Sequence, residues 1–208
     1  CIEWIDERYR YLSELEFVDE LDVLEQMFEQ HKVDHRDIMD YRQNVDTCIA
    51  RQAEVSAEDS ATYCDLLATL ESSYQQLRDL STGRVLDLDS LIAFIRAAQI
   101  ELLWINEREE LEVTRNWSDI NQLDLPMLQN YYKQLLHEIE LREEGFNMVH
   151  NQGAALLNQG HPAVHVIEVY LTTMQSQWDW LLNLAKCLEV HLQDAMNLKQ
   201  FMEEARTC

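Results

Sequence analysis

Glycine and proline are scarce in this chain of 208 residues, which contains four glycines and two prolines. Sheets and tight hairpins need these residues at their turns, so the shortage argues against a β-rich fold. Apolar residues make up 47% of the chain, which is enough for a sizeable core and argues against a disordered protein. Because leucine, glutamate, glutamine and alanine are abundant, the sequence predicts an all-α fold.

Positive charge is also in short supply, with 16 lysines and arginines against 39 acidic residues and a net charge of −23. A field of this sign repels phosphates, so we expect no nucleic-acid partner, and charge-steered partners should be basic. Arg96 and Glu101 interrupt the most apolar stretch, and the N-terminus shows no signal-peptide pattern, so we expect no direct membrane insertion. Helical patterns continue to both ends, which is expected of a segment excised from a longer protein.

The cysteines are odd in number and scattered, and no pair has the C-x-x-C spacing. They are Cys1, Cys48, Cys64, Cys187 and Cys208. This pattern favours neither a disulfide scaffold nor a zinc ribbon, and it fits a reducing, cytosolic setting. Cys48 and Cys64 stand equally far from a turn expected near Ser56, so they can lie at similar heights on neighbouring helices. Reduced thiols are expected there, with a redox switch as the alternative.

A tandem repeat organises the chain. The sequence WIDER at residues 4–8 recurs as WINER at residues 104–108. Nine positions of the first unit alternate in steps of three and four, which is a heptad pattern. They are Leu21, Leu24, Phe28, His31, His35, Ile38, Arg42, Val45 and Ile49. The first eight positions have counterparts 104 residues later. These counterparts are Leu125, Leu128, Tyr132, Leu135, Ile139, Arg142, Phe146 and Val149.

Each unit is expected to be an antiparallel bundle of three helices, with the units covering residues 1–86 and 87–208. In the first unit the helices are expected over residues 1–14, 17–54 and from about 58 onward. Their further apolar positions are Ile2, Ile5, Tyr9, Leu12, Tyr63, Leu67, Leu70, Tyr74 and Leu77. The apolar positions expected on the first and third helices of the second unit are Leu91, Phe94, Ala98, Leu102, Ile105, Val164, Ile167, Leu171, Met174, Trp178, Leu181, Ala185, Leu188, Leu192 and Ala195. Gly160 can end a helix before Pro162 opens the next.

One continuous helix over residues 58–112 is expected to join the two units, because no proline or multi-residue turn signal intervenes. The triplet Ser81-Thr82-Gly83 is its weakest point, and Asp87 or Asp89 could cap a new helix there. We favour continuity because the flanking bundles supply the lateral packing that a long helix needs. The sequence thus predicts an elongated rod.

Five segments of the second unit resemble the plakin-domain spectrin repeats of the plakin and spectraplakin family. They are Leu103–Glu110, Asn116–Asp119, Gly160–Ala163, Gln177–Trp180 and Glu189–Leu192, and the Trp-Ser-Asp loop is the most specific. The resemblance implies a structural rod in a cytoskeletal linker, located in the cytoplasm at the cytoskeleton and at cell junctions such as hemidesmosomes. The implied partners are neighbouring repeats, cytoskeletal filaments through other parts of the parent, and in an alternative function junctional membrane receptors.

No residue pattern predicts catalysis, cofactor binding or a metal site. The pairs His31/His35 and His161/His165 have the spacing of metal ligands, but neither is followed by the glutamate of a metalloprotease. We expect His31 and His35 to be at least partly buried and neutral, and His161 to cap a helix or shape a turn. Acidic runs in residues 107–112 and 138–144 contain no Glu-x-x-His and should be solvated.

The tryptophans are expected to be structural rather than to stack on a ligand, since aromatic residues at heptad positions usually belong to the core. Trp104 should pack against Trp178. Trp117 should fold its loop back over the end of the bundle, with Ser118 and Asp119 capping a helix.

Overall fold

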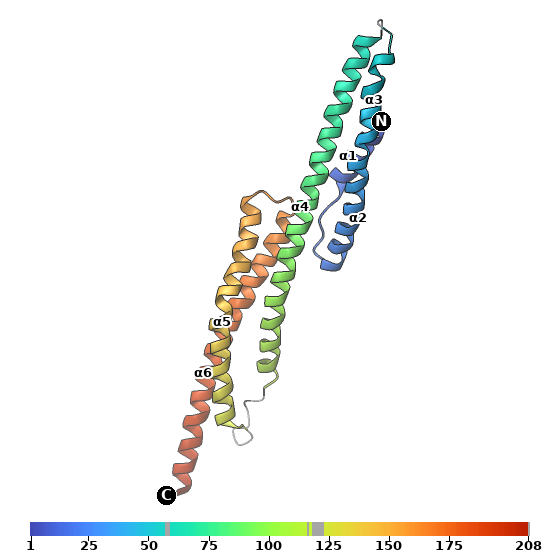
Figure 1. The fold of residues 1–208 in the computed structure, drawn as a ribbon. Helices are drawn as coiled ribbons and strands as arrows, with labels where there is room; N and C mark the ends of the chain where they lie inside the picture. The colour runs from blue at the N-terminus through green and yellow to red at the C-terminus, as the bar shows by residue number, and fades with distance from the viewer. Residues whose placement is uncertain (57–58, 116, 118–122, 208) are drawn as a thin grey trace. The chain divides into compact units, whose positions relative to one another are not determined.

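The structure is a computed structural model that describes residues 1–56, 59–115, 117 and 123–207. Six α-helices and a short 3-10 helix contain most of these residues, and none of them lies in a strand (Figure 1). The elements are α1 Ile2–Glu14, α2 Leu21–Asp40, α3 Arg42–Ala50, η1 Arg51–Glu54, α4 Ser60–Val113, α5 Leu125–Asn158 and α6 Val164–Thr207. The predicted all-α fold is therefore confirmed.

The chain divides into two compact units. Unit 1 contains Cys1–Ala93 together with His161–Val166, and unit 2 contains Phe94–Gly160 and Ile167–Cys208. The division at residue 86 that the sequence suggested stays a prediction. α4 contributes to both units, and it continues through Ser81, Thr82 and Gly83 without a break. The predicted joining helix is therefore present, from Ser60 to Val113.

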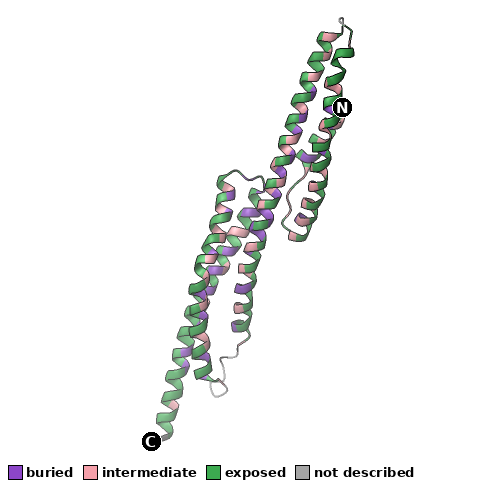
Figure 2. Ribbon diagram, in the orientation of Figure 1, coloured by how far each residue is buried: buried purple, intermediate pink, exposed green. Residues whose placement is uncertain are grey.

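The core of unit 1 follows the heptad pattern of the sequence (Figure 2). Four residues spaced by seven on α2 and α3 are fully buried, and the five that alternate with them are half-buried. The buried four are Leu24, His31, Ile38 and Val45. Tyr9 is an exception, because its side chain is 41% exposed and the half-buried Arg8 occupies the step between Ile5 and Leu12 instead.

The helix predicted over residues 17–54 begins later and is interrupted. It starts at Leu21, has a turn at Tyr41 and ends in η1. At the interruption Tyr41 stacks on Trp4 of α1, with the ring centroids 3.8 Å apart and the planes 9° from parallel. Neither glycine nor proline marks this position, so the sequence carried no signal for the turn.

At the heptad positions that the sequence predicted for residues 87–208, the side chains are buried or half-buried, except Val164, which is 43% exposed. Val164 is the first residue of α6, so the heptad face begins only at Ile167. The α5–α6 turn contains Gly160 with a φ of 76°, a conformation that glycine adopts without strain. Pro162 precedes the first residue of α6 by two positions. At the start of α5, Asp124 caps the helix by accepting a hydrogen bond from the Met127 amide at 3.0 Å.

Candidate functional site

A layer of polar side chains crosses the core of unit 1. The Nε2 of His31 donates to the Ser81 carbonyl oxygen at 3.0 Å, and the Nδ1 of His35 lies 2.9 Å from the Ser81 hydroxyl. Ser81 is fully buried and His31 is 3% exposed. Burial lowers the pKa of His31 below its ordinary 6.5, although the hydrogen bond to Ser81 opposes the shift. The predicted burial of His31 is therefore confirmed, and the lowered pKa favours its neutral form.

Arg84 lies one helical turn beyond Ser81 and is also buried. Its Nη2 donates to the Leu15 carbonyl oxygen at 2.7 Å, and its guanidinium carbon lies 4.7 Å from the centroid of the Phe17 ring. These contacts attach the segment between α1 and α2 to α4. Burial lowers the pKa of Arg84, and the nearby Asp87 charge opposes that shift.

Sequence reasoning missed Ser81 and Arg84, although a signal for both exists. The seven-residue step from Leu70 to Leu77 leads directly to Arg84, and the step from Tyr74 leads to Ser81. Extending the heptads through the polar triplet would have placed both residues on the buried face.

A hollow of about 360 Å³ lies beside this layer in unit 1. Its walls include Tyr11, Leu15, Val23, Gln26, Met27, Gln30, His31, Asp34, Arg84 and Leu88. The buried Nδ1 of His31 and Nε of Arg84 have no hydrogen-bond partner among the described residues. An ordered water is the simplest group that would satisfy polar atoms in such a space.

His161 shapes the turn before α6, as the sequence predicted. Its Nδ1 accepts a hydrogen bond from the Ala163 amide at 3.0 Å, so its Nε2 carries the proton and donates to the Asp87 carbonyl oxygen at 3.0 Å. The imidazole also lies 5.8 Å from the Phe17 ring, measured between centroids. His165, the other member of the predicted pair, is exposed.

The repeated WIDER and WINER boxes make one contact in common. In unit 1 the Arg8 guanidinium carbon lies 5.6 Å from the centroid of the Trp4 ring, and in unit 2 Arg108 lies 5.6 Å from the Trp104 ring. Tryptophan and arginine are four residues apart, which places them on the same face of a helix. The two boxes therefore form the same cation–π pair.

Trp104 and Trp178 both belong to the core of unit 2, so the predicted core position of Trp104 is confirmed, while its direct packing against Trp178 stays a prediction. The aromatic ring stacked on Trp178 is that of Phe146, with the centroids 4.5 Å apart. Arg108, which lies over Trp104, is paired with Glu138 at 2.9 Å. The Arg108–Glu138 pair therefore joins α4 to α5, and the Phe146–Trp178 stack joins α5 to α6.

Most of the acidic residues in the two predicted runs are exposed or half-buried, but Glu112 is buried. Both of its carboxylate oxygens accept hydrogen bonds from Arg115, at 2.8 and 3.0 Å. Arg115 in turn lies 5.3 Å from the centroid of the Tyr131 ring. Burial, with the Glu112 charge as a smaller cause, raises the pKa of Tyr131 to about 12. Glu112 therefore holds Arg115 over Tyr131 of α5.

Trp117 is half-buried and packs edge-on against His191, with the ring centroids 5.4 Å apart. The contact agrees with the expectation that Trp117 ties its loop to the bundle. The predicted caps at Ser118 and Asp119 lie outside the described residues, as do Ala57 and Glu58 at the other loop.

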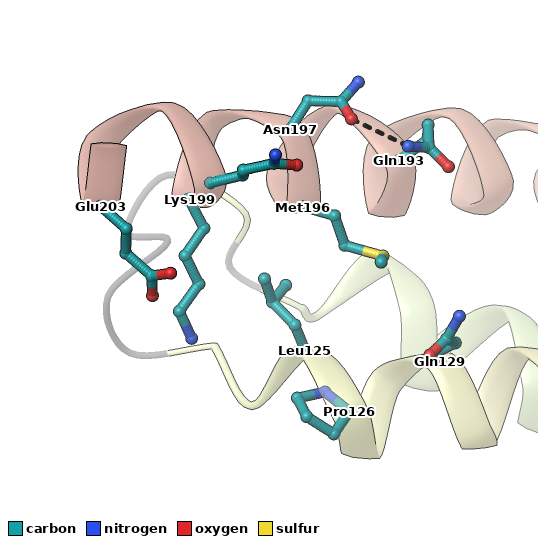
Figure 3. A pocket seen from close by; sticks show the side chains of 9 residues that line it. Leu125, Pro126, Gln129, Gln193, Met196, Asn197, Lys199 and Glu203 are labelled. Carbon is teal, nitrogen blue, oxygen red and sulfur yellow. Dashed lines mark hydrogen bonds between the residues drawn. The ribbon is translucent and has the colours of Figure 1, made fainter. Parts of the chain in front are cut away.

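A second hollow, of about 380 Å³, separates the first turn of α5 from the last turns of α6 (Figure 3). Leu125 and Pro126 face Met196 and Lys199 across it, and Gln193 is hydrogen-bonded to Asn197 at 2.9 Å along α6. Its lining contains amide, aliphatic and thioether groups, with Lys199 and Glu203 as the charged residues. A single carboxylate and no histidine or cysteine do not make up the donor set of a metal site.

Among the described residues, no three histidine, cysteine, aspartate or glutamate side chains gather closely enough to hold a metal ion. The described helices also include none that is both long and apolar enough to cross a bilayer. The absence of catalytic, cofactor and metal residues stays a prediction. Cys48 lies against Cys1, and Cys64 accepts a hydrogen bond from Gln52 at 3.1 Å. The expectation that Cys48 and Cys64 lie at similar heights stays a prediction.

Comparison with known proteins agrees with the architecture. The family model of the spectrin repeat matches residues 1–90 and again residues 89–194. Human microtubule-actin cross-linking factor 1 is 29% identical over 205 residues, and zebrafish (Danio rerio) desmoplakin-A is 31% identical over 207. Each alignment covers 99% of this chain, but the chain spans only 3% and 10% of these relatives.

A solved structure shares the fold. The crystal structure of a rigid four-repeat fragment of the human desmoplakin plakin domain superposes with a TM-score of 0.85 at 29% identity, covering the whole of this chain and 44% of that one. The chain therefore belongs to the spectrin-repeat family, and it is homologous to microtubule-actin cross-linking factor 1 and to the plakin domain of desmoplakin.

Proposed function

We propose that this segment is a non-enzymatic structural rod in a cytoskeletal linker protein. It spaces and mechanically connects cytoskeletal filaments and junctional complexes, and it works in the cytoplasm at the cytoskeleton and at cell junctions. Filaments attach through other parts of the parent protein, while neighbouring repeats contact this segment directly. The names of the relatives, a microtubule-actin cross-linking factor and a desmoplakin, support this class of function.

The observation that carries the proposal is the length of α4. This helix runs for 54 residues, about 80 Å at 1.5 Å per residue, and supplies core residues to both units. A hinge needs a turn or loop whose dihedral angles can change at little cost, whereas bending a helix interior breaks hydrogen bonds. A shared helix therefore favours two repeats that move as one stiff body and pass force along the backbone.

Small-angle X-ray scattering of the chain and of Ala97→Pro tests this proposal. An interior proline costs about 3 kcal/mol and kinks the helix, so the variant should show a broader distribution of interatomic distances than wild type. Ser60→Pro is the matched control, because proline is tolerated at the first position of a helix. A wild-type protein that already scatters as a flexible pair of beads would eliminate the stiff-rod function.

A second candidate is a protein-interaction module that docks a junctional receptor or another basic, helical partner. The acidic surface of α5 favours it, because Glu140, Glu143 and Glu144 are exposed and border a shallow hollow with Met148. Replacing these three glutamates by glutamine should weaken binding of basic receptor tails measured by titration calorimetry. The same change at Glu107, Glu109 and Glu110 serves as the control.

A further inference from the structure

Two thiols that are far apart in the sequence meet in unit 1. The Sγ atoms of Cys1 and Cys48 are 3.5 Å apart, although 47 positions separate them along the chain. Cys1 caps the start of α1, and Cys48 lies in the last turn of α3. Cys1 is exposed and Cys48 is half-buried, so small oxidants can reach the pair from solvent.

The backbone on both sides of this pair is held by packing. Trp4, one turn after Cys1, stacks on Tyr41, which lies seven residues before Cys48. Ile2 and Ile49, the neighbours of the two cysteines, pack on the same core cluster. Since a disulfide bond is about 2.05 Å long, the sulfur atoms need to approach by only about 1.5 Å. Rotation of the two side chains supplies a movement of this size.

We propose that Cys1 and Cys48 form a reversible disulfide when the protein meets a peroxide, and that this bond clamps α1 to α3. The sulfur of one thiolate attacks a peroxide oxygen, the O–O bond breaks, and a sulfenic acid and hydroxide form. The second thiol then attacks the sulfenic sulfur, the S–O bond breaks and water leaves. Two thiols and one hydrogen peroxide thus give one disulfide and two water molecules, and a dithiol reductant reverses the reaction.

The other described cysteines provide the contrast. Cys64 accepts a hydrogen bond from Gln52, and Cys187 is exposed on α6 in unit 2. The structure places neither of their sulfur atoms in hydrogen-bond contact with another described thiol. Cysteine content alone gives five candidates, and the 3.5 Å contact selects one pair.

Closing this bond changes the stability of unit 1. The disulfide closes a loop of 47 residue steps and so restricts the unfolded chain. For a domain of this size a typical disulfide corresponds to a rise of roughly 5 °C or more in the Tm of unit 1. Once the disulfide has formed, α1 cannot separate from α3 unless the bond is reduced. That this restraint would help a load-bearing rod rests on the proposed function.

The test uses the 208-residue chain in which Cys64, Cys187 and Cys208 are replaced by serine. After treatment with hydrogen peroxide and trypsin, mass spectrometry without reductant should find residues 1–8 linked to residues 43–51, lighter by two hydrogens than the sum of the free peptides. The matched variant keeps Cys48 and Cys64 and carries Cys1→Ser, and it should give no intramolecular link. Dithiothreitol should remove both the link and the rise in Tm.

Single-molecule pulling from the two ends of the chain gives a second measurement. In the oxidised chain the contour gained on full unfolding should be roughly 165 Å shorter, because the residues between Cys1 and Cys48 no longer extend. Free thiols after oxidation, or links only between molecules, would overturn the proposal. This result is independent of the rod function, since a stiff rod without the bond leaves the scattering prediction intact.

Discussion

Arg142 of α5 lies over the indole ring of Trp104 of α4, with its guanidinium carbon 4.6 Å from the ring centroid. Its Nη1 also donates to Glu101 at 3.0 Å. The equivalent position of unit 1, 104 residues earlier, is the buried Ile38. A charged residue thus takes a core position because its flat guanidinium packs on an aromatic face while Glu101 neutralises its charge.

Removing the indole at this site should destabilise unit 2. Trp104→Ala is expected to lower the free energy of unfolding by about 3 to 5 kcal/mol, because a buried tryptophan is replaced by a cavity. Thermal melts should then show unit 2 unfolding before unit 1. Trp180→Ala is the control, since Trp180 is 47% exposed and should change Tm little. A shift of a degree or less for Trp104→Ala would contradict its place in the core.

Two glycines should respond in opposite directions to replacement by alanine. A Cβ on Gly153 would lie 2.6 Å from Phe94 Cε2 and 2.8 Å from Leu171 Cδ2, so Gly153→Ala should lower Tm. A Cβ on Gly83 would have no described atom within 4 Å, apart from the neighbouring backbone. Gly83→Ala should therefore raise stability by up to about 1 kcal/mol, the helix propensity difference. Denaturant titration measures both, and equal effects would disprove the close approach at Gly153.

Stability should depend on pH through His31. Its folded pKa is depressed by burial, so the unfolded chain binds a proton below about pH 6.5 that the folded chain does not. The stability associated with neutral His31 is therefore present above the unfolded pKa and is lost as pH falls through the lower, folded pKa. Replacing both His31 and His35 by leucine should raise Tm, more at pH 5 than at pH 8.

Single substitutions isolate the His31 contribution. In His31→Leu the loss of unfolding free energy between pH 8 and pH 5 should be smaller than in wild type. The exposed His137→Leu is the control and should keep the wild-type pH profile. Parallel profiles for wild type and His31→Leu would show that another group titrates.

The turn before α6 should depend on one of its two histidines. His161→Ala removes an acceptor for the Ala163 amide and a donor for the Asp87 carbonyl, and both groups lie in buried or half-buried surroundings. The Asp87 carbonyl keeps a hydrogen bond from the Ser90 hydroxyl, but the buried Ala163 amide loses its acceptor. Leaving that amide unpaired costs about 1 to 3 kcal/mol, so Tm should fall by several degrees. His165→Ala changes an exposed side chain and should leave Tm unchanged. Chemical denaturation monitored by circular dichroism compares the two, and equal losses would contradict a structural role for His161.

The sequence by itself determined the all-α class, the repeat and the heptad positions. Low glycine and proline content and a spacing of three and four are local properties that specify amphipathic helices without knowledge of their partners. The same local pattern indicated α4, because no residue between Ser60 and Val113 forces a helix to end. Heptads bury one face whatever packs on it, so Leu24, Ile38 and Val45 were predictable as core.

Only the tertiary structure decided which residues from different helices meet. The pairing of His31 with Ser81, the contact of Cys1 with Cys48 and the position of Arg142 over Trp104 depend on how far each helix is shifted along its neighbour. Tyr9 shows the same limit. Its spacing from Ile5 and Leu12 is compatible with a core position, but its side chain is exposed and Arg8, which lies over Trp4, occupies that heptad step instead. A heptad specifies which face is buried, but the axial register that brings particular side chains together arises from packing across the whole bundle.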